Sequence, residues 1–171
     1  MSESLFLREA VAEMGRYKAL TEKALGQVTD ADFFRQVDPE SNSIAVILKH
    51  LAGNMRSRWS DFLTTDGEKP DRDRDGEFVM EGPDERAAIL QRWEEGWHLA
   101  LSQCASLGRE DETRVIYIRG EAHTVVRALE RQLAHLAYHV GQIVFLAKHH
   151  AGTGWQTLTI PRNRARKSTR K

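Results

Sequence analysis

The sequence predicts an all-α protein: a four-helix bundle in up-down order with longer crossover loops, and a short β-hairpin before the last helix. Four long segments carry apolar residues at spacings of three and four, which is the pattern of an amphipathic helix. The segments between them are rich in Gly, Pro, Asp and Ser, which favour turns and loops. At 171 residues the chain has the length of one domain, which we expect to occupy residues 1–160.

The first half of the chain is expected to contain two of these helices. The first spans residues 3–25 and is followed by Gly26, which suits a helix C-terminus. A connecting segment with one short helical turn at Ala31–Phe34 leads to Ser43, a good N-cap for a second helix that extends to about Leu63. The apolar stripe of this second helix comprises Ile44, Ile47, Leu48, Leu51, Met55, Trp59 and Phe62.

A charged segment with Gly and Pro, residues 64–78, separates the second and third helices. It is longer than a minimal turn requires, so we interpret it as an excursion that covers a site. The third helix is expected over about residues 84–107, because Pro83 stands near its start and Gly108 follows its end.

The last helix, over residues 124–150, follows the predicted hairpin, whose apolar residues alternate around Arg119-Gly120. Besides its main apolar stripe, this helix carries Ala134, Tyr138 and Phe145 on its remaining face. A helix that is apolar nearly all round is usually buried on more than one side. Central placement in a monomer would explain the pattern, but the prevalence of two-fold oligomers favours a homodimer formed through this helix.

Composition excludes several functional classes. The chain has 25 basic and 25 acidic residues, so no net field attracts nucleic acid or a membrane surface. It has no apolar run of membrane-spanning length and no signal-peptide pattern, which favours a cytoplasmic protein. The single Cys104 allows neither an internal disulfide nor a cysteine zinc cage. The basic segment 161–171 is expected to be a disordered tail.

The chemical signal lies in the last helix, where His135 and His139 are four residues apart. Side chains at this spacing lie one turn above each other and can bind one metal ion together. The glutamate of an H-E-x-x-H motif is absent, so this pattern indicates a metal site without a built-in general base. Two histidines are too few for a typical catalytic zinc site, and His50 on the second helix is the best candidate for the third ligand.

Five further polar residues are candidates for contacts with an imidazole ring or a substrate. Asn54, Arg58 and Gln142 stand near the histidine edges of the two helices, as does Gln132. Tyr17 on the first helix is a candidate cavity hydroxyl, although a role in the core explains it better. For each of them, an ordinary structural position is the alternative.

These histidines and their neighbours resemble a known family. The segments HLAGN (residues 50–54) and AHLAYHVGQI (residues 134–143) resemble the DinB/YfiT-like superfamily of metal-binding four-helix proteins. More narrowly, residues 50–78 and the closing GWQTLTIPRN are similar to a branch defined only as a domain of unknown function. The resemblance implies a four-helix bundle, often a homodimer, with a divalent metal held by His50, His135 and His139.

Members of this superfamily with known activity include thiol S-transferases and a thiol-dependent isomerase. The resemblance therefore implies a metal-dependent transferase that activates a low-molecular-weight thiol. A metal-dependent hydrolase and a non-catalytic bundle that binds a ligand or partner remain alternatives, because no residue in the chain selects a thiol. Imidazole ligands suit several divalent metals, so zinc, nickel, iron and manganese all remain candidates.

Overall fold

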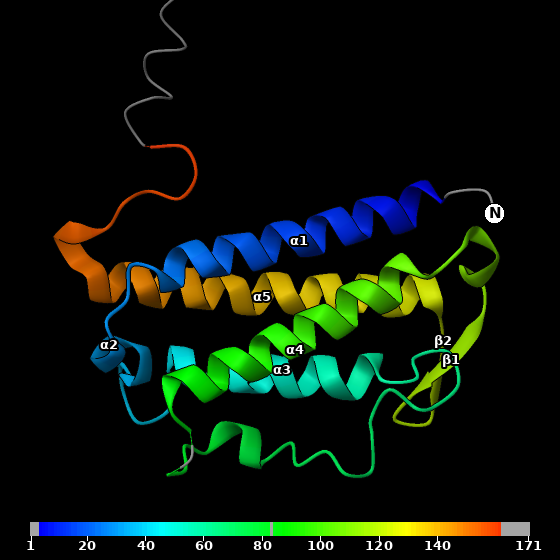
Figure 1. Ribbon diagram of the computed structural model, residues 1–171, viewed down its shortest axis with the longest axis horizontal. Coiled ribbons are helices and arrows are strands. Elements are labelled where there is room, and N and C mark those ends of the chain that lie inside the picture. Colours follow the sequence, from blue (N-terminus) through cyan, green and yellow to red (C-terminus); the bar gives the residue numbers. More distant parts are fainter. Residues whose placement is uncertain (1–3, 83, 162–171) are drawn as a thin grey trace, which may run out of the picture.

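The computed structural model describes residues 4–82 and 84–161, so the predicted basic tail lies, apart from Pro161, outside the described residues. Within these residues the protein is mostly helical, with a two-stranded antiparallel sheet (Figure 1). The elements are α1 (Leu5–Leu25), α2 (Asp30–Phe34), α3 (Ile44–Trp59), η1 (Gly76–Phe78), α4 (Arg86–Ala105), η2 (Arg109–Asp111), β1 (Val115–Ile118), β2 (Glu121–Thr124), α5 (Val125–Ala151) and η3 (Gly152–Gly154). None of these helices is long and apolar enough to cross a membrane.

The helix starts agree with the sequence prediction, whereas one helix end does not. Ser43 and Thr124 cap α3 and α5, since each hydroxyl accepts the backbone N–H three residues further on. The second helix was expected to reach Leu63, but it ends at Trp59. Ser60 has an extended backbone and Asp61 has a left-handed φ of 47°, which stops the helix. Phe62 nevertheless stays buried with its ring centroid 4.4 Å from that of Trp59, so the apolar pattern continues past the helix.

The long helices pack beside one another in pairs. α3 contacts α4, α1 contacts α5, and smaller contacts join α1 with α4 and α3 with α5. Figure 1 shows that α3 and α4 run in the same direction, because the crossover loop (residues 60–82) returns along the outside of α3 before α4 begins. As a result α3 and α5 are antiparallel, and the middle of each helix lies opposite the middle of the other. The predicted up-down order is therefore wrong for α3 and α4.

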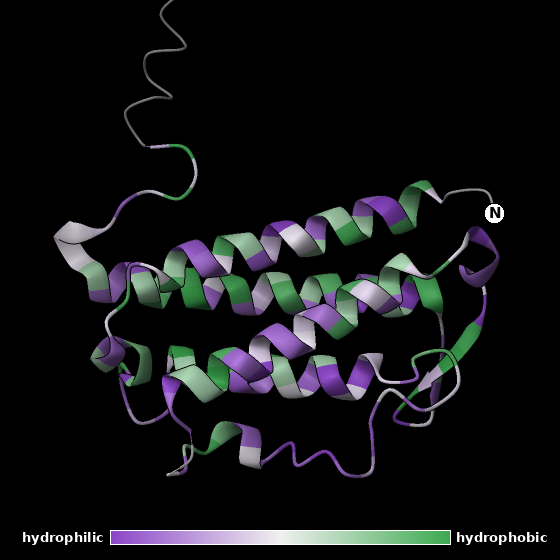
Figure 2. Ribbon diagram, in the orientation of Figure 1, coloured by the Kyte–Doolittle hydropathy of each residue, from purple (hydrophilic) through white to green (hydrophobic). Residues whose placement is uncertain are grey.

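The core lies between these helices and contains large aromatic side chains. Trp59 comes from α3, and Trp93 and Trp97 come from α4; all three are buried. Cys104 is also buried, and burial raises the pKa of its thiol, as expected for an unreactive core cysteine. Figure 2 shows the contrast between the apolar residues along α5 and the hydrophilic crossover loop on the outside.

The predicted hairpin is confirmed, and it anchors the start of the crossover loop. β1 and β2 pair from Val115 with Thr124 to Ile118 with Glu121. Arg119 and Gly120 both have positive φ, as a tight two-residue hairpin turn requires. The carboxylate of Asp66 accepts both of their backbone N–H groups at 2.8 Å. The turn therefore holds the loop against the end of α3.

Asp84 fastens the other end of the crossover region to the bundle. Its carboxylate accepts hydrogen bonds from Lys49 on α3 and Arg92 on α4, each at 2.6 Å. Burial opposes ionisation, but these partners and the Glu81 N–H outweigh it and lower the pKa of Asp84 to about 2 from 3.8.

We expect Asp84→Asn to lower the free energy of unfolding by about 2 kcal/mol at pH 7, because this pKa difference corresponds to that energy. A depressed carboxyl pKa stabilises the fold above the unfolded-state pKa and less so as pH falls from about 4 to about 2. Urea unfolding of both proteins at pH 7 and pH 3 measures the difference. An equal loss at both pH values would contradict this role of the charge.

One face of α5 remains exposed in the single chain. Ala134, Tyr138 and Phe145 lie on this face, and the two aromatic side chains are 63% and 67% exposed. Large aromatic residues that are exposed on one face of a single chain are typical of a surface that another protein chain covers. The homodimer predicted through this face stays a prediction.

Candidate metal centre

Three histidines from two helices come together in the middle of the molecule. His50 lies on α3, and His135 and His139 lie one turn apart on α5. One nitrogen of each ring falls within 4.8 Å of the others, and the Nε2 atoms of His50 and His135 are 3.1 Å apart. The antiparallel packing of α3 against α5 therefore brings His50 beside His135 and His139. The sequence pattern alone does not show this contact.

The spacing of these nitrogens suits a shared metal ion. Metal–nitrogen bonds of about 2.0–2.1 Å separate two ligands by about 2.9 Å at a right angle and about 3.3 Å at the tetrahedral angle. The 3.1 Å between the Nε2 atoms of His50 and His135 lies between these values. The ring centroid of His139 is 5.0 Å from that of His50 and 4.6 Å from that of His135. The three rings thus fit one face of a coordination shell.

Hydrogen bonds orient two of the three rings. The Nδ1 of His50 donates to Oε2 of Glu77 at 2.9 Å, and the Nδ1 of His139 donates to Oε1 of Gln142 at 2.8 Å. With the proton on Nδ1, each Nε2 presents a lone pair to the centre of the triad. Such partners beyond the ligands are typical of histidines that bind metals.

Glu77 is held by more than its contact with His50. Arg72 binds both carboxylate oxygens, Nε to Oε1 at 2.7 Å and the second terminal nitrogen to Oε2 at 2.8 Å. Burial works against the charged form, but the hydrogen bonds from His50 and Arg72 outweigh it and hold the pKa of Glu77 below its ordinary value. Phe78 adds a ring whose centroid is 4.9 Å from that of His50. The crossover loop therefore covers the triad on the α3 side.

The histidines on α5 are neutral at physiological pH. Burial, followed by the neighbouring His139, His50 and Arg58, lowers the pKa of His135 to about 3. Burial and His50 also lower the pKa of His139, against the opposing effect of its bond to Gln142. Neutral imidazole is the form that binds a metal, so protons compete little for these nitrogens at pH 7.

The other candidate residues differ in burial and in whether they contact the triad. Asn54, Arg58 and Gln132 are buried. Within residues 4–82 and 84–161, each has an atom without a hydrogen-bond partner: Oδ1, Nε and Nε2, respectively. Gln142 contacts His139, as described. Tyr17 packs against the core of α1, and its pKa is raised by burial and by Glu13 on the same helix. None of the described contacts joins Tyr17 to the triad.

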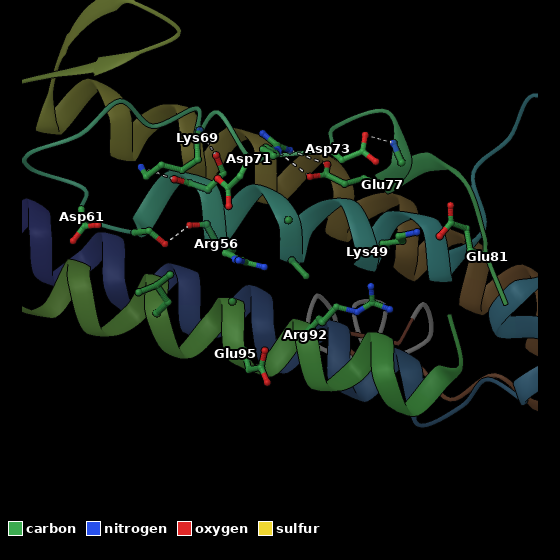
Figure 3. A pocket seen from close by; sticks show the side chains of 18 residues that line it. Lys49, Arg56, Asp61, Lys69, Asp71, Asp73, Glu77, Glu81, Arg92 and Glu95 are labelled. Atoms are coloured by element: carbon green, nitrogen blue, oxygen red, sulfur yellow. Dashed lines mark hydrogen bonds and ion pairs between the residues drawn. The ribbon is translucent and has the colours of Figure 1, made fainter. Parts of the chain in front are cut away.

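A cavity of about 630 Å³ lies on the other side of Glu77, between α3, α4 and the crossover loop (Figure 3). Charged side chains of both signs line it, among them Lys49, Arg56, Arg92, Glu81 and Glu95. Glu77 also lines this cavity, whereas none of the three histidines does. Glu77 thus belongs both to the lining of this cavity and to the contacts of His50, and we do not regard the cavity as the site where chemistry occurs.

Sequence reasoning missed Glu77 and Arg72. Both lie in a segment where acidic and basic residues alternate, and Glu77 is 27 residues from His50, so no spacing rule links them. The length of the loop did predict that it covers a site. The other feature of the sequence that points to Glu77 is Gly53, because a Cβ atom at that position would lie 2.2 Å from Oε1 of Glu77. A small residue one turn beyond a candidate ligand marks a position where another chain segment approaches the helix.

Fold and site together define a class: a mostly helical protein with a cluster of three histidines that can hold a metal ion. The chain belongs to the family described as protein of unknown function (DUF1572), whose model matches residues 2–164. No curated protein matches the sequence.

Proposed function

We propose that this protein is a cytoplasmic enzyme with the four-helix bundle of the DinB/YfiT-like superfamily. In this proposal His50, His135 and His139 hold a divalent metal, and the reaction transfers a low-molecular-weight thiol to an electrophile. The observation that carries the proposal is the triad itself, with its Nε2–Nε2 distance of 3.1 Å and Nδ1 atoms bonded to Glu77 and Gln142. Two further observations favour transfer over a purely structural role.

The first is that the protein supplies only neutral ligands to the ion. Three imidazoles leave the full charge of a divalent metal for its remaining positions, where it strongly lowers the pKa of a thiol or water. The second is that the described part of the site has no free base: the Glu77 carboxylate is occupied by His50 and Arg72. A substrate that ionises readily, such as a thiol, suits such a site better than one that needs a general base.

The protein itself takes little direct part in the bond changes of the transfer. The sulfur forms a bond to the electrophilic carbon, the leaving group departs with its bonding electrons, and the thiol proton passes to solvent. His135 is only partly buried, so the triad is reached by solvent from this side. The role of Glu77 and Gln142 is to keep the two imidazoles in position while the substrates exchange.

The proposal is tested by loading chelated protein separately with zinc, nickel, manganese and iron(II). We expect at least one metal to increase the conjugation of 2-mercaptoethanol or cysteine to an activated chloroarene by 10-fold or more over the chelated protein. Released chloride and the loss of free thiol are measured together, and elemental analysis of the purified protein identifies the resident metal. The control variant His98→Ala, which removes an exposed histidine on α4, should keep the metal-dependent activity.

Other outcomes decide between the alternatives. Metal binding without turnover across a panel of thiols and esters would replace the transferase with a non-catalytic binding module. Metal-dependent ester cleavage without thiol conjugation would identify a hydrolase instead.

A further inference from the structure

An uncompensated positive charge lies on α3, two helical turns beyond His50. Arg58 is only 9% exposed, and no residue that the structure describes forms a hydrogen bond or ion pair with its guanidinium. Burying a charge without a partner costs several kcal/mol, so buried arginines are almost always paired. The pKa of Arg58 is lowered to about 10 by burial and by Arg131, so the group stays protonated at neutral pH.

The nearby carboxylates do not neutralise this charge, because they have other partners. Glu68 pairs with Arg72 at 3.0 Å and Arg119 at 3.5 Å, and Glu77 is bound by Arg72 and His50. A second cation in the same region, Arg131, donates to the neutral ring of His123 at 2.7 Å. Three neighbouring arginines, Arg131, Arg72 and Arg119, thus act against the charge of Arg58, and Glu68 alone of the main charged influences supports it.

The position of Arg58 is built into the fold. Its side chain lies against Gly67, where a Cβ atom would come within 2.9 Å of Cδ and 3.1 Å of Nε. Gly67 is itself held by two bonds: its N–H donates to the Tyr117 carbonyl at 2.8 Å, and its carbonyl accepts from Ser57 at 3.1 Å. The contact with Gly67 limits the conformations open to the end of the Arg58 stem, and a side chain that is already restricted loses less entropy when it binds a ligand.

Two buried amides accompany the guanidinium. Asn54 follows His50 by one helical turn and precedes Arg58 by one turn on α3, and Gln132 precedes His135 by about one turn on α5. Among the described residues, Oδ1 of Asn54 and Nε2 of Gln132 have no hydrogen-bond partner. Of the two, only the Gln132 nitrogen can donate to an anion. Because α3 and α5 are antiparallel, these residues continue the histidine edge of each helix in the same direction, toward the hairpin.

We propose that Arg58, with the side-chain amide N–H of Gln132, binds the anionic group, a carboxylate, of the molecule whose other end reacts at the triad. Arginine is well suited to this role, because its planar donors match the two oxygens of a carboxylate. His50 and Arg58 are eight residues apart, or about 12 Å along the helix, so the anionic group lies several bonds from the reacting atom. This inference rests on the proposed function and names the substrate class of that site.

The test compares thiols that differ only in charge: 3-mercaptopropionate, 4-mercaptobutanoate and 6-mercaptohexanoate, each against its uncharged amide. Their affinities for the zinc-loaded protein are measured by calorimetry. We expect a carboxylate of suitable length to bind about 10–100-fold more tightly than its amide, the range of a charged hydrogen-bonded pair. Arg58→Met should abolish this preference, and Arg58→Lys should retain part of it. Arg56→Met is the matched control, since Arg56 is an exposed arginine on the same helix that lines the other cavity.

Stability provides a readout that separates ligand binding from a structural role. Removing an unpaired buried charge while keeping the length of the side chain should leave the free energy of unfolding of Arg58→Met unchanged or raised. A preference for carboxylates that survives in Arg58→Met, or equal affinity of carboxylates and amides at every length, would overturn the inference.

Zinc binding is measured first on the same samples without thiol. Failure to bind zinc would refute the proposed function. The carboxylate–amide comparison on chelated protein would then test separately whether Arg58 binds a carboxylate. If the chelated protein prefers carboxylates and this preference requires Arg58, the anion site is supported. If the protein binds no zinc and the chelated protein shows no such preference, the anion site is refuted.

Discussion

Replacing His135 with alanine is expected to weaken zinc binding by about 100–1000-fold. Structural zinc sites with four ligands contribute about 10–16 kcal/mol, which is about 3–4 kcal/mol for each ligand. His135 is the ligand that joins the two helices, since its Nε2 lies 3.1 Å from that of His50 and its ring is one turn from His139. Without it, the two remaining imidazoles hold an ion poorly. Competition with a chromophoric chelator measures the affinity of each variant.

The same substitution should leave the metal-free protein folded. His135 is partly buried and neutral at pH 7, so alanine removes no ion pair. The difference should appear only with metal: zinc at 100 times the wild-type dissociation constant stabilises the wild type by about 2.7 kcal/mol and should stabilise the variant by about 0.4 kcal/mol or less. His98→Ala should behave as wild type in both measurements. Undiminished zinc affinity in His135→Ala would remove the triad as the metal site.

Gly53→Ala is expected to lower zinc affinity by about 10–100-fold although residue 53 contacts no ligand atom. The new Cβ would lie 2.2 Å from Oε1 of Glu77, so the carboxylate must move away from α3. The ring of His50 then loses the acceptor at 2.9 Å that fixes its tautomer and direction. Loss of such an orienting partner typically costs 10–100-fold in metal affinity. Glu77→Gln should have a smaller effect, since its amide oxygen can still accept from Nδ1.

Gly15→Ala on α1 is the matched control for this prediction. Both substitutions replace a helical glycine and gain helix propensity, by about 0.5–1 kcal/mol. Apart from the neighbouring backbone of α1, no described atom lies within 4 Å of a Cβ at residue 15, so this variant should be more stable with unchanged zinc affinity. If Gly53→Ala also binds zinc like the wild type, the contact of Glu77 with His50 does not tune the metal site.

Much of the helical architecture was predictable because it follows from local pattern. The apolar spacing located the long helices, the hydroxyl caps Ser43 and Thr124 set two of the starts, and alternation around Arg119-Gly120 located the hairpin. The end of α3 was predicted four residues too late. Phe62 continues the apolar period but is buried from a turn, and periodicity alone does not distinguish these cases.

The candidate site was predictable only in part. The i, i+4 spacing of His135 and His139 placed two rings on one face of a helix, and His50 was nominated from the edge of another helix. Glu77 was not predictable, since it reaches His50 from a loop 27 residues away. Arg58 was a candidate by position, but its lack of a partner depends on the neighbours that surround it in space.

The sequence by itself determined what depends on neighbours within a turn or two: helix periodicity, caps, the hairpin turn and the pairing of two histidines on one face. Only the tertiary structure decided which helices face each other, where the crossover loop returns, and which charges remain unpaired. The physical reason is range. Backbone preferences and side-chain spacing act over a few residues, whereas burial, ion pairing and metal geometry depend on distances between segments that packing alone brings together.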